Sequence, residues 1–515
     1  MCSLQGAGSR RRGSHSSWAG DPGRRGGWRR VVPLAWRTRL ARGALAASAL
    51  ALVALPAAPA PAQQVPGLPP DVNPLTPGST VPIPGGLGLG PIELEGLRNA
   101  RIFDPRTRKF TQAESMHYGR WYMSTVRLPG GKVFAAGGVT KLVKNTELFN
   151  VRPTETFDPA TGHWTEHEED VGINSSLPLY PRLWLMPNGK VFYDGNGQNW
   201  GPFGQSPDET QWALQRFYNL RTNRWEVAGP APSGVRSGAL DAMLTIKPPY
   251  RSATVLTAGG VSGPSPGSLV AQNVSNLTTV DRSGHVTNSR TSPLNHARWF
   301  SQAVTLPDGS VAAFSGGDKD EVIDPGTERA VHQIELFNPA TRRWTPGPVD
   351  PRDRTYHNTA VLLPDARVLV GGHSPISNAY GYNHDNPGFA NNERDASFEV
   401  YSPPYLFRGR RPRIAGVQSG ISWGRRFTVR TGDAARVKSV VLSSLPATTH
   451  VLDNNQRTIQ LAFRRGSGNT LRVKAPPSGN VAPPGPYMLF VNKKTARGLQ
   501  PSTSVQMFLG LSTVQ

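Results

Sequence analysis

Tyrosine and histidine side chains recur at one position of a repeated hairpin in this 515-residue chain. The position lies six residues before the Leu or Met that precedes each hairpin turn, and it holds Tyr122, Tyr180, Phe300 and His357. Tyr356 directly precedes the last of these. Phenolate oxygen and neutral imidazole nitrogen are borderline ligands that suit Cu(II) better than calcium or magnesium. The pattern predicts a copper site, unless the rings are ordinary strand residues that fill the space between the hairpins.

The hairpins belong to a larger repeated unit. Each copy has two strands around a turn, a glycine pair, and two further strands that close on an aromatic residue, as in WYMSTVRLPGGKVFAAGG followed by TETFDPATGHWT. Four strands recurring about every 55–65 residues are typical of a kelch-type β-propeller. A β-sandwich with coincidental turns would not repeat DPATGHW, LRTNRW and NPATRRW in register. We therefore predict an all-β fold with a kelch propeller over residues 97–408, whose inner strands line a central channel.

The first unit of this propeller is incomplete. Residues Ala100–Gln112 read as the outer half of a unit, and no recognisable inner hairpin comes before them, so the sequence contains five and a half units. Either residues 70–98 complete the ring in a disguised form, or the N-terminal part of the ring is lost or replaced.

The pattern changes near residues 408–412. From Arg411 onward, short alternating strands follow one another at a spacing of about 8–12 residues, without the glycine pairs of the repeat. This spacing is typical of a β-sandwich. We predict a second domain over residues 409–515.

The N-terminal segment is predicted to direct export. Residues 1–42 contain ten Arg and one Asp, and the apolar run Gly43–Leu55 is followed by small residues up to about Ala62. This order is typical of a secretory signal, and the apolar run is too short for a transmembrane anchor. We expect residues 1–63 to be the signal region, residues 64–96 a Pro/Gly-rich linker, and the protein to be secreted or in the cell envelope.

Charge and cysteine content exclude some functions. The formal net charge is +22, but nine of these charges lie in residues 1–42, and the rest of the chain has no concentrated basic helix or nucleic-acid motif. We therefore expect no nucleic-acid partner. Cys2 is the only cysteine. Once the signal region is removed, the protein can have no disulfide, zinc–thiolate site or cysteine nucleophile.

Over residues 97–512 the chain resembles the galactose oxidase and glyoxal oxidase family of copper-radical oxidases. The resemblance rests on the repeats and on two C-terminal motifs, TTHVLDNNQRTIQLAF and VAPPGPYMLFVNKKTARGLQPSTSV. It implies a seven-bladed propeller, a C-terminal immunoglobulin-like domain, and one copper held by two tyrosines and two histidines.

The ligand positions of that family have counterparts in this chain. GRWYMST places the equatorial tyrosine at Tyr122, and RTYHNTA places the axial tyrosine at Tyr356 and one histidine at His357. THVLDNNQR places the second histidine, which arrives on a loop of the C-terminal domain, at His450. The other histidines, such as His117, His296 and His373, have no comparable support.

The chain departs from the family at the residues that stabilise a radical. In the family, a cysteine in the preceding blade is cross-linked to the equatorial tyrosine, and an aromatic residue stacks on the pair. Residues 3–515 contain no cysteine, so this thioether cannot form, and Val139-Thr140-Lys141 stands where the stacking aromatic is expected.

Two functions follow as hypotheses. The first is an exported copper enzyme that oxidises a small primary alcohol, aldehyde or carbohydrate with O₂ and releases H₂O₂, with Tyr356 as proton acceptor and Tyr122 as equatorial ligand or radical. The second is a non-catalytic kelch propeller that binds carbohydrate or a cell-envelope partner, such as a glycan. The four ligands favour the first, and the missing cysteine and incomplete blade favour the second.

Overall fold

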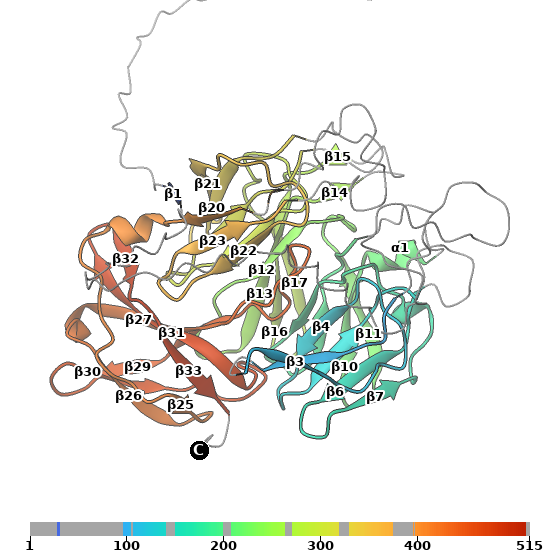
Figure 1. Ribbon diagram of the computed structural model, residues 1–515, viewed down its shortest axis with the longest axis horizontal. Coiled ribbons are helices and arrows are strands. Elements are labelled where there is room, and N and C mark those ends of the chain that lie inside the picture. The colour runs from blue at the N-terminus through green and yellow to red at the C-terminus, as the bar shows by residue number, and fades with distance from the viewer. Residues whose placement is uncertain are drawn as a thin grey trace, which may run out of the picture.

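The computed structural model describes residues 96–104, 107–140, 150–198, 208–262, 270–318, 329–373, 395 and 397–510, together with the backbone of Trp28–Arg30. The predicted signal region and linker therefore lie outside the described residues, except for Trp28–Arg30 and Gly96. Within the described ranges, none of the helices combines the length and the apolar character needed to cross a membrane. The fold is all-β, as predicted, with many small antiparallel sheets and a C-terminal sandwich (Figure 1).

Five four-stranded sheets form blades of the propeller in the described part of the chain. In chain order the strands of the first four are β4 (Ser124–Arg127), β5 (Val133–Ala136), β6 (Thr154–Asp158) and β7 (His163–His167); β8 (Leu183–Leu185), β9 (Val191–Tyr193), β10 (Leu214–Asn219) and β11 (Arg224–Pro230); β12 (Leu240–Met243), β13 (Ser252–Ala258), β16 (Ser275–Asp281) and β17 (Val286–Arg290); and β18 (Gln302–Thr305), β19 (Val311–Phe314), β20 (Gln333–Asn338) and β21 (Arg343–Val349).

The fifth sheet joins strands from distant parts of the chain. It contains β22 (Thr359–Leu362), β23 (Val368–Gly371), β24 (Phe398–Tyr401) and β1 (Trp28–Arg30). β1 pairs antiparallel with β24, so the fourth strand comes from the segment that the sequence predicts to be a secretory signal.

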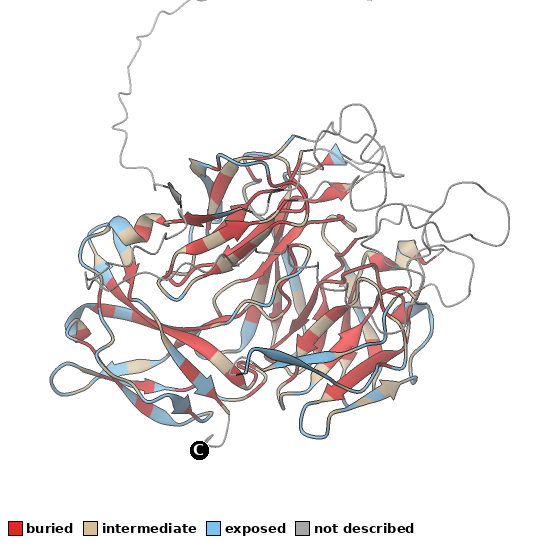
Figure 2. Cartoon of the chain, in the orientation of Figure 1, coloured by how far each residue is buried: buried red, intermediate tan, exposed pale blue. Residues whose placement is uncertain are grey.

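The incomplete unit predicted at Ala100–Gln112 is a two-stranded sheet of β2 (Arg101–Asp104) and β3 (Lys109–Gln112). Both strands are largely exposed, whereas the inner strands of the blades are buried (Figure 2). A second small sheet pairs β14 (Val261–Ser262) with β15 (Val270–Ala271). The short helices of the described residues are α1 (Glu209–Trp212) and the 3₁₀ turns Ile173–Ser175, Pro404–Phe407 and Ala434–Arg436.

The C-terminal sandwich consists of a larger and a smaller sheet. The larger contains β25 (Gly420–Ile421), β33 (Val505–Leu509), β31 (Gly485–Thr495), β27 (Val437–Ser444) and β28 (Thr458–Leu461), with β32 (Gly498–Pro501) paired to β31; the smaller contains β26 (Arg426–Arg430), β30 (Thr470–Lys474) and β29 (Phe463–Arg465). Alternate residues of β26 and β30 are buried, as the sequence pattern predicts for strands with one solvent-facing side.

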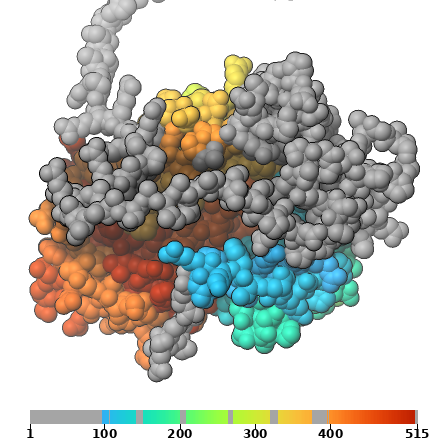
Figure 3. All heavy atoms as spheres, in the orientation of Figure 1, coloured from blue at the N-terminus to red at the C-terminus, as the bar shows by residue number. Residues whose placement is uncertain are grey.

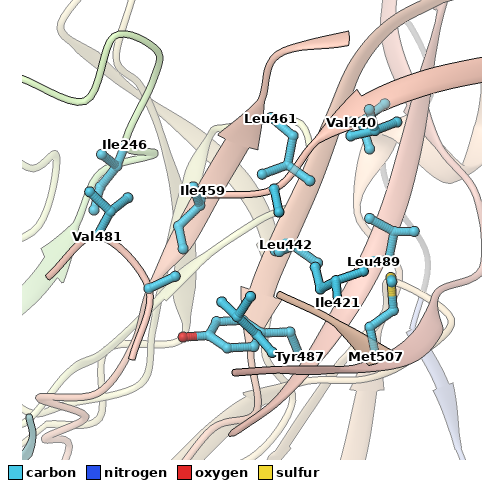
Figure 4. Close-up of a cluster of buried hydrophobic side chains, with 14 of the residues drawn as sticks. Ile246, Ile421, Val440, Leu442, Ile459, Leu461, Val481, Tyr487, Leu489 and Met507 are labelled. Carbon is cyan, nitrogen blue, oxygen red and sulfur yellow. The ribbon is translucent and has the colours of Figure 1, made fainter. Parts of the chain in front are cut away.

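The sandwich and the propeller share one hydrophobic core. Ile246 of the propeller lies beside Val481 and Ile459 of the sandwich (Figure 4). Ile246 also exchanges backbone hydrogen bonds with the segment that contains Ile459, donating to the Thr458 carbonyl and accepting from Gln460 N–H. Because buried apolar area stabilises by about 25 cal/mol per Å², this continuous core holds the two domains in a fixed relationship. In the space-filling view the blue surface of the start of the propeller borders the orange and red surface of the C-terminal domain (Figure 3).

Buried ion pairs fix the chain just before three of the inner strands. Arg120 lies 2.8 Å from Glu155 of β6, and Arg298 lies 2.8 Å from Glu335 of β20, with all four side chains fully buried. Arg354 occupies the same place in the last blade, 3.5 Å from Glu399 of β24. Each pair ties the segment that enters an inner strand to the third strand of the same blade. These segments carry the recurring Tyr/His position.

Candidate metal centre

The recurring position has the same unusual backbone conformation in all four predicted copies. The φ angles of Tyr122, Tyr180, Phe300 and His357 are 61°, 44°, 47° and 50°, in the left-handed region. Gly238 is at the equivalent position in the degenerate third copy, and its φ is 62°. Residues other than glycine pay about 1–3 kcal/mol for such a conformation, and such residues cluster at functional sites. The sequence predicts the shared position but not this shared conformation.

The structure brings together the four residues that the sequence predicts as ligands. The hydroxyl oxygens of Tyr122 and Tyr356 lie 2.9 Å apart, and the Nε2 atoms of His357 and His450 lie 3.1 Å apart. The rings of Tyr356 and His357 are 3.9 Å apart, and those of Tyr122 and His450 are 4.7 Å apart. Tyr122 precedes β4 and the Tyr356–His357 pair precedes β22, whereas His450 comes from the C-terminal domain.

His450 reaches this point on the loop 445–457, which joins β27 to β28. Side-chain amides of the loop bind the inner strands of the propeller. Asn455 Oδ1 accepts a hydrogen bond from Arg127 N–H at 2.8 Å, and Gln456 Oε1 accepts one from the Thr305 hydroxyl at 2.8 Å. These bonds place the loop in the channel between blades and determine where the imidazole of His450 lies.

Burial keeps the His450 imidazole neutral. Burial, together with the smaller effects of the nearby His357 and Arg182, lowers the pKa of His450 to about 3. A neutral imidazole is the form that binds a metal ion. The Nδ1 atom of His450 lies 2.8 Å from the Tyr180 hydroxyl and 2.8 Å from the Thr449 hydroxyl.

Tyr122 lies between two aromatic rings. The Trp121 ring stacks on it at a centroid distance of 3.6 Å and an interplanar angle of 14°, and the Tyr180 ring stacks at 4.3 Å and 27°. The family resemblance implies a stacking aromatic at Val139–Lys141, where this chain has none. Lys141 lies outside the described residues. The stacking role of Trp121 was not predicted, although the motif GRWYMST contains this residue. In a regular strand, the side chain adjacent to Tyr122 would point to the opposite face.

The three other histidines considered from the sequence, all among the described residues, have partners outside the group of four. His117 Nδ1 lies 3.1 Å from Glu155, and the His296 backbone N–H donates to Glu335. His373 is buried, and its Nδ1 accepts a hydrogen bond from Thr355 N–H at 3.1 Å. His373 therefore supports the segment that carries Tyr356.

The four donors fit a copper ion. Two ligand atoms about 2 Å from one ion and at right angles to one another are about 2.8 Å apart. The separations of 2.9 Å between the two tyrosine oxygens and 3.1 Å between the two histidine nitrogens are close to this value. Nowhere in the described ranges do three His, Cys, Asp or Glu side chains gather as a metal site, so the tyrosines are needed to complete a ligand set. Two oxygen and two nitrogen donors of this kind suit Cu(II).

Comparisons with known proteins cover both domains. The family described as glyoxal oxidase N-terminus matches residues 92–405, and the galactose oxidase-like early set domain matches residues 411–504. An aldehyde oxidase of Arabidopsis thaliana is 26% identical over 404 residues, which cover 72% of this chain and 61% of the relative. An aldehyde oxidase of Vitis pseudoreticulata is 26% identical, with 77% and 75% covered. A galactose oxidase of Gibberella zeae is also 26% identical, with 78% and 57% covered.

The chain thus spans less than two thirds of the length of the Arabidopsis and Gibberella relatives. Among solved structures, a fungal alcohol oxidase in complex with copper superimposes with a TM-score of 0.65 at 23% identity, covering 82% of this chain and 83% of the other. That likeness confirms the fold of propeller and sandwich. Because the N-terminal family match alone covers more than half of the sequence, this chain belongs to the galactose oxidase and glyoxal oxidase family, with a C-terminal early set domain.

Proposed function

We propose that this protein binds one copper ion through Tyr122, Tyr356, His357 and His450 and oxidises a primary alcohol or an aldehyde with O₂. The observation that carries the proposal is the convergence of these four side chains, from two blades and the second domain, at donor separations of 2.9 and 3.1 Å. The relatives in plants and fungi that carry the names aldehyde oxidase and galactose oxidase support the reaction class.

The reaction balances without another reactant for an alcohol. RCH₂OH and O₂ give RCHO and H₂O₂, and an aldehyde needs one water in addition to give the acid and H₂O₂. A bound copper ion supplies a redox centre and a Lewis acid. The Tyr356 phenolate then takes the proton from the substrate hydroxyl, as a general base within hydrogen-bond reach. Tyr122 completes the ligand set or holds the radical.

The exposure of the site agrees with a small-molecule substrate. Tyr356 is buried, whereas Tyr122, His357 and His450 are partly exposed. This partial exposure supports access of a small molecule to the site. We further propose that residues 1–63 direct export, so that the reaction takes place outside the cytoplasm.

The test is to load purified protein with Cu(II) and to measure copper content, the electron paramagnetic resonance spectrum, and peroxide release over a panel of alcohols, aldehydes and glycans. We expect one copper per chain and peroxide with at least one class. Absence of stoichiometric copper, or copper that is unaffected by both His357→Ala and His450→Ala, would refute the site.

A second candidate function is a non-catalytic propeller that binds carbohydrate or a cell-envelope partner. The observation that favours it is that Cys2 is the only cysteine, so the family's tyrosine–cysteine cross-link has no counterpart. Copper bound without peroxide from any substrate, together with glycan binding that does not need copper, would support this candidate over the oxidase.

A further inference from the structure

We propose that Tyr180 is a positioning residue that holds His450 in the tautomer whose Nε2 atom is free to bind the metal. This inference rests on the proposed copper site but concerns a residue outside the ligand set. Tyr180 shares the recurring position and the left-handed backbone with Tyr122 and His357, yet its hydroxyl faces the other nitrogen of His450.

The tautomer of His450 determines whether its Nε2 atom can bind the metal ion. Its Nε2 lies 3.1 Å from His357 Nε2, on the side of the four donors, and its Nδ1 lies 2.8 Å from the Tyr180 hydroxyl on the other side. A neutral imidazole carries one proton, and a nitrogen that carries it has no lone pair for a metal. Only the Nδ1–H tautomer therefore leaves Nε2 available, and this tautomer needs a hydrogen-bond acceptor at Nδ1.

Two hydroxyl oxygens offer that acceptor, and they are not equivalent. Tyr180 is buried, with 8% of its surface exposed, whereas Thr449 is an exposed residue. The exposed Thr449 is more accessible to water than the buried Tyr180, so water can replace the Thr449 hydroxyl as a partner of Nδ1 more easily than it can replace the Tyr180 hydroxyl. We therefore infer that Tyr180 contributes more than Thr449 to the stability of the Nδ1–H tautomer of His450.

Tyr180 also orders the site through its ring. The ring stacks on Tyr122 at 4.3 Å and on His450 at 4.7 Å, and the Tyr180 backbone N–H donates to the Tyr122 carbonyl at 2.7 Å. One residue thus contacts a tyrosine ligand from the first described blade and a histidine ligand from the second domain. Substitution by phenylalanine keeps the stacking and removes only the hydroxyl.

The experiment compares the wild type with Tyr180→Phe, Thr449→Val and the double variant. Nitrogen-15 NMR of histidine-labelled, copper-free protein reports the tautomer of His450, with His450→Gln used to assign its signals. We expect the Nδ1–H form in the wild type and a shift towards Nε2–H in Tyr180→Phe. Calorimetric titration with Cu(II) should give a roughly 10- to 100-fold weaker Kd, as for other partners of metal-bound histidines. The effect in Thr449→Val should be smaller.

Tyr250→Phe is the matched control, because the Tyr250 hydroxyl donates to the Gln460 carbonyl at 3.0 Å and does not contact the ligands. It should change neither the tautomer nor the Kd. If Tyr180→Phe retains both the wild-type tautomer and the wild-type Kd, the positioning role is refuted while the copper site stands. If the wild type binds no copper but Tyr180→Phe still changes the tautomer, the positioning of His450 stands and the proposed function fails.

Discussion

The hydroxyl oxygens of Tyr122 and Tyr356 lie 2.9 Å apart, although 234 residues separate them in the chain. Each tyrosine lies at the entrance of an inner strand, and the propeller brings the entrances of different blades to one channel. The relationship therefore depends on the closure of many blades, not on local sequence. It also places two phenols where one can bind an ion while the other exchanges a proton with a substrate.

Removal of His450 should abolish tight copper binding. His450→Ala removes a direct nitrogen donor, so the loss of Cu(II) affinity should exceed the roughly 10- to 100-fold that supporting partners contribute. Calorimetric titration measures it. His117→Ala is the control, since that side chain is 43% exposed and pairs with Glu155. Equal copper affinities of the two variants would show that His450 is not a ligand.

Tyr356 should matter more for turnover than for copper retention. In Tyr356→Phe three donors remain, so copper stays bound more weakly, while peroxide release should fall by at least about 100-fold because the general base is lost. Peroxide release at saturating copper measures the effect. Tyr218→Phe alters a buried hydroxyl that accepts from Thr154, away from the ligands, and should leave the rate unchanged. A Tyr356→Phe variant with full activity would contradict the proton-acceptor role.

The stack of Trp121 on Tyr122 should affect the rate without changing the ligand set. Aromatic pairs contribute about 0.5–1.5 kcal/mol beyond area burial, which corresponds to up to about tenfold in rate if the stack favours the oxidised tyrosine. Trp121→Leu should therefore lower kcat by up to about tenfold with the Cu(II) Kd little changed. Trp121→Phe, which keeps a stacked ring, should recover most of the rate. A parallel fall in both quantities would instead indicate a disrupted site.

Arg298 and Glu335 form a buried ion pair, and removal of one partner alone should destabilise the protein more than removal of both. Glu335→Leu leaves the Arg298 guanidinium buried without its partner, and such a loss costs about 3–5 kcal/mol. The double variant Arg298→Met/Glu335→Leu should recover part of this free energy of unfolding, because no charge is left unpaired, although the Asn295 and His296 N–H groups lose the Glu335 carboxylate as acceptor. Urea denaturation measures each variant. The half-exposed pair of Arg367 and Asp365 is the control, with about 0–1 kcal/mol expected for Arg367→Ala.

The propeller fold could be predicted from the sequence because each repeated unit is formed by residues that are close together in the chain. In four of the five hairpin turns a residue of positive φ lies three positions after the Leu or Met, as with Gly131 and Gly189, and the degenerate third copy departs from this pattern. Such turns are recognisable within a single copy of the repeat. The half unit at Ala100–Gln112 was recognised in the same way and is present as β2 and β3.

The site was only partly predictable from sequence. Tyr122, Tyr356, His357 and His450 were placed by motif, and the structure brings them together. The stacked position of Trp121 was not predicted, because strand alternation sends neighbouring side chains to opposite faces and the left-handed φ of 61° at Tyr122 breaks that alternation.

The contact of Tyr180 with His450 was missed for a different reason. It joins the second blade to a loop that is 270 residues later, and the sequence motif of neither segment refers to the other. Contacts of this kind depend on how the sandwich docks on the propeller.

Protonation of the buried Asp350 carboxyl should make the free energy of unfolding depend on pH. Burial, together with the neighbouring Glu399 carboxyl, raises the pKa of Asp350 to about 8. Because the pKa in the unfolded chain is near 3.9, the folded protein holds this proton more tightly. The contribution to the free energy of unfolding is therefore fully present below about pH 4 and is lost as the pH rises towards about 8, at no more than about 1.4 kcal/mol per pH unit.

Asp350→Asn removes this titration while keeping an oxygen that can accept from Arg352 N–H, which donates to Asp350 at 3.0 Å in the wild type. The variant should lose less stability than the wild type between pH 5 and pH 8 (a window of about three units), as measured by urea denaturation across that range. Asp365→Asn, in a half-exposed pair with Arg367, is the control and should follow the wild-type curve. If the curves of Asp350→Asn and the wild type run parallel over this range, the Asp350 carboxyl does not retain its proton in the folded protein.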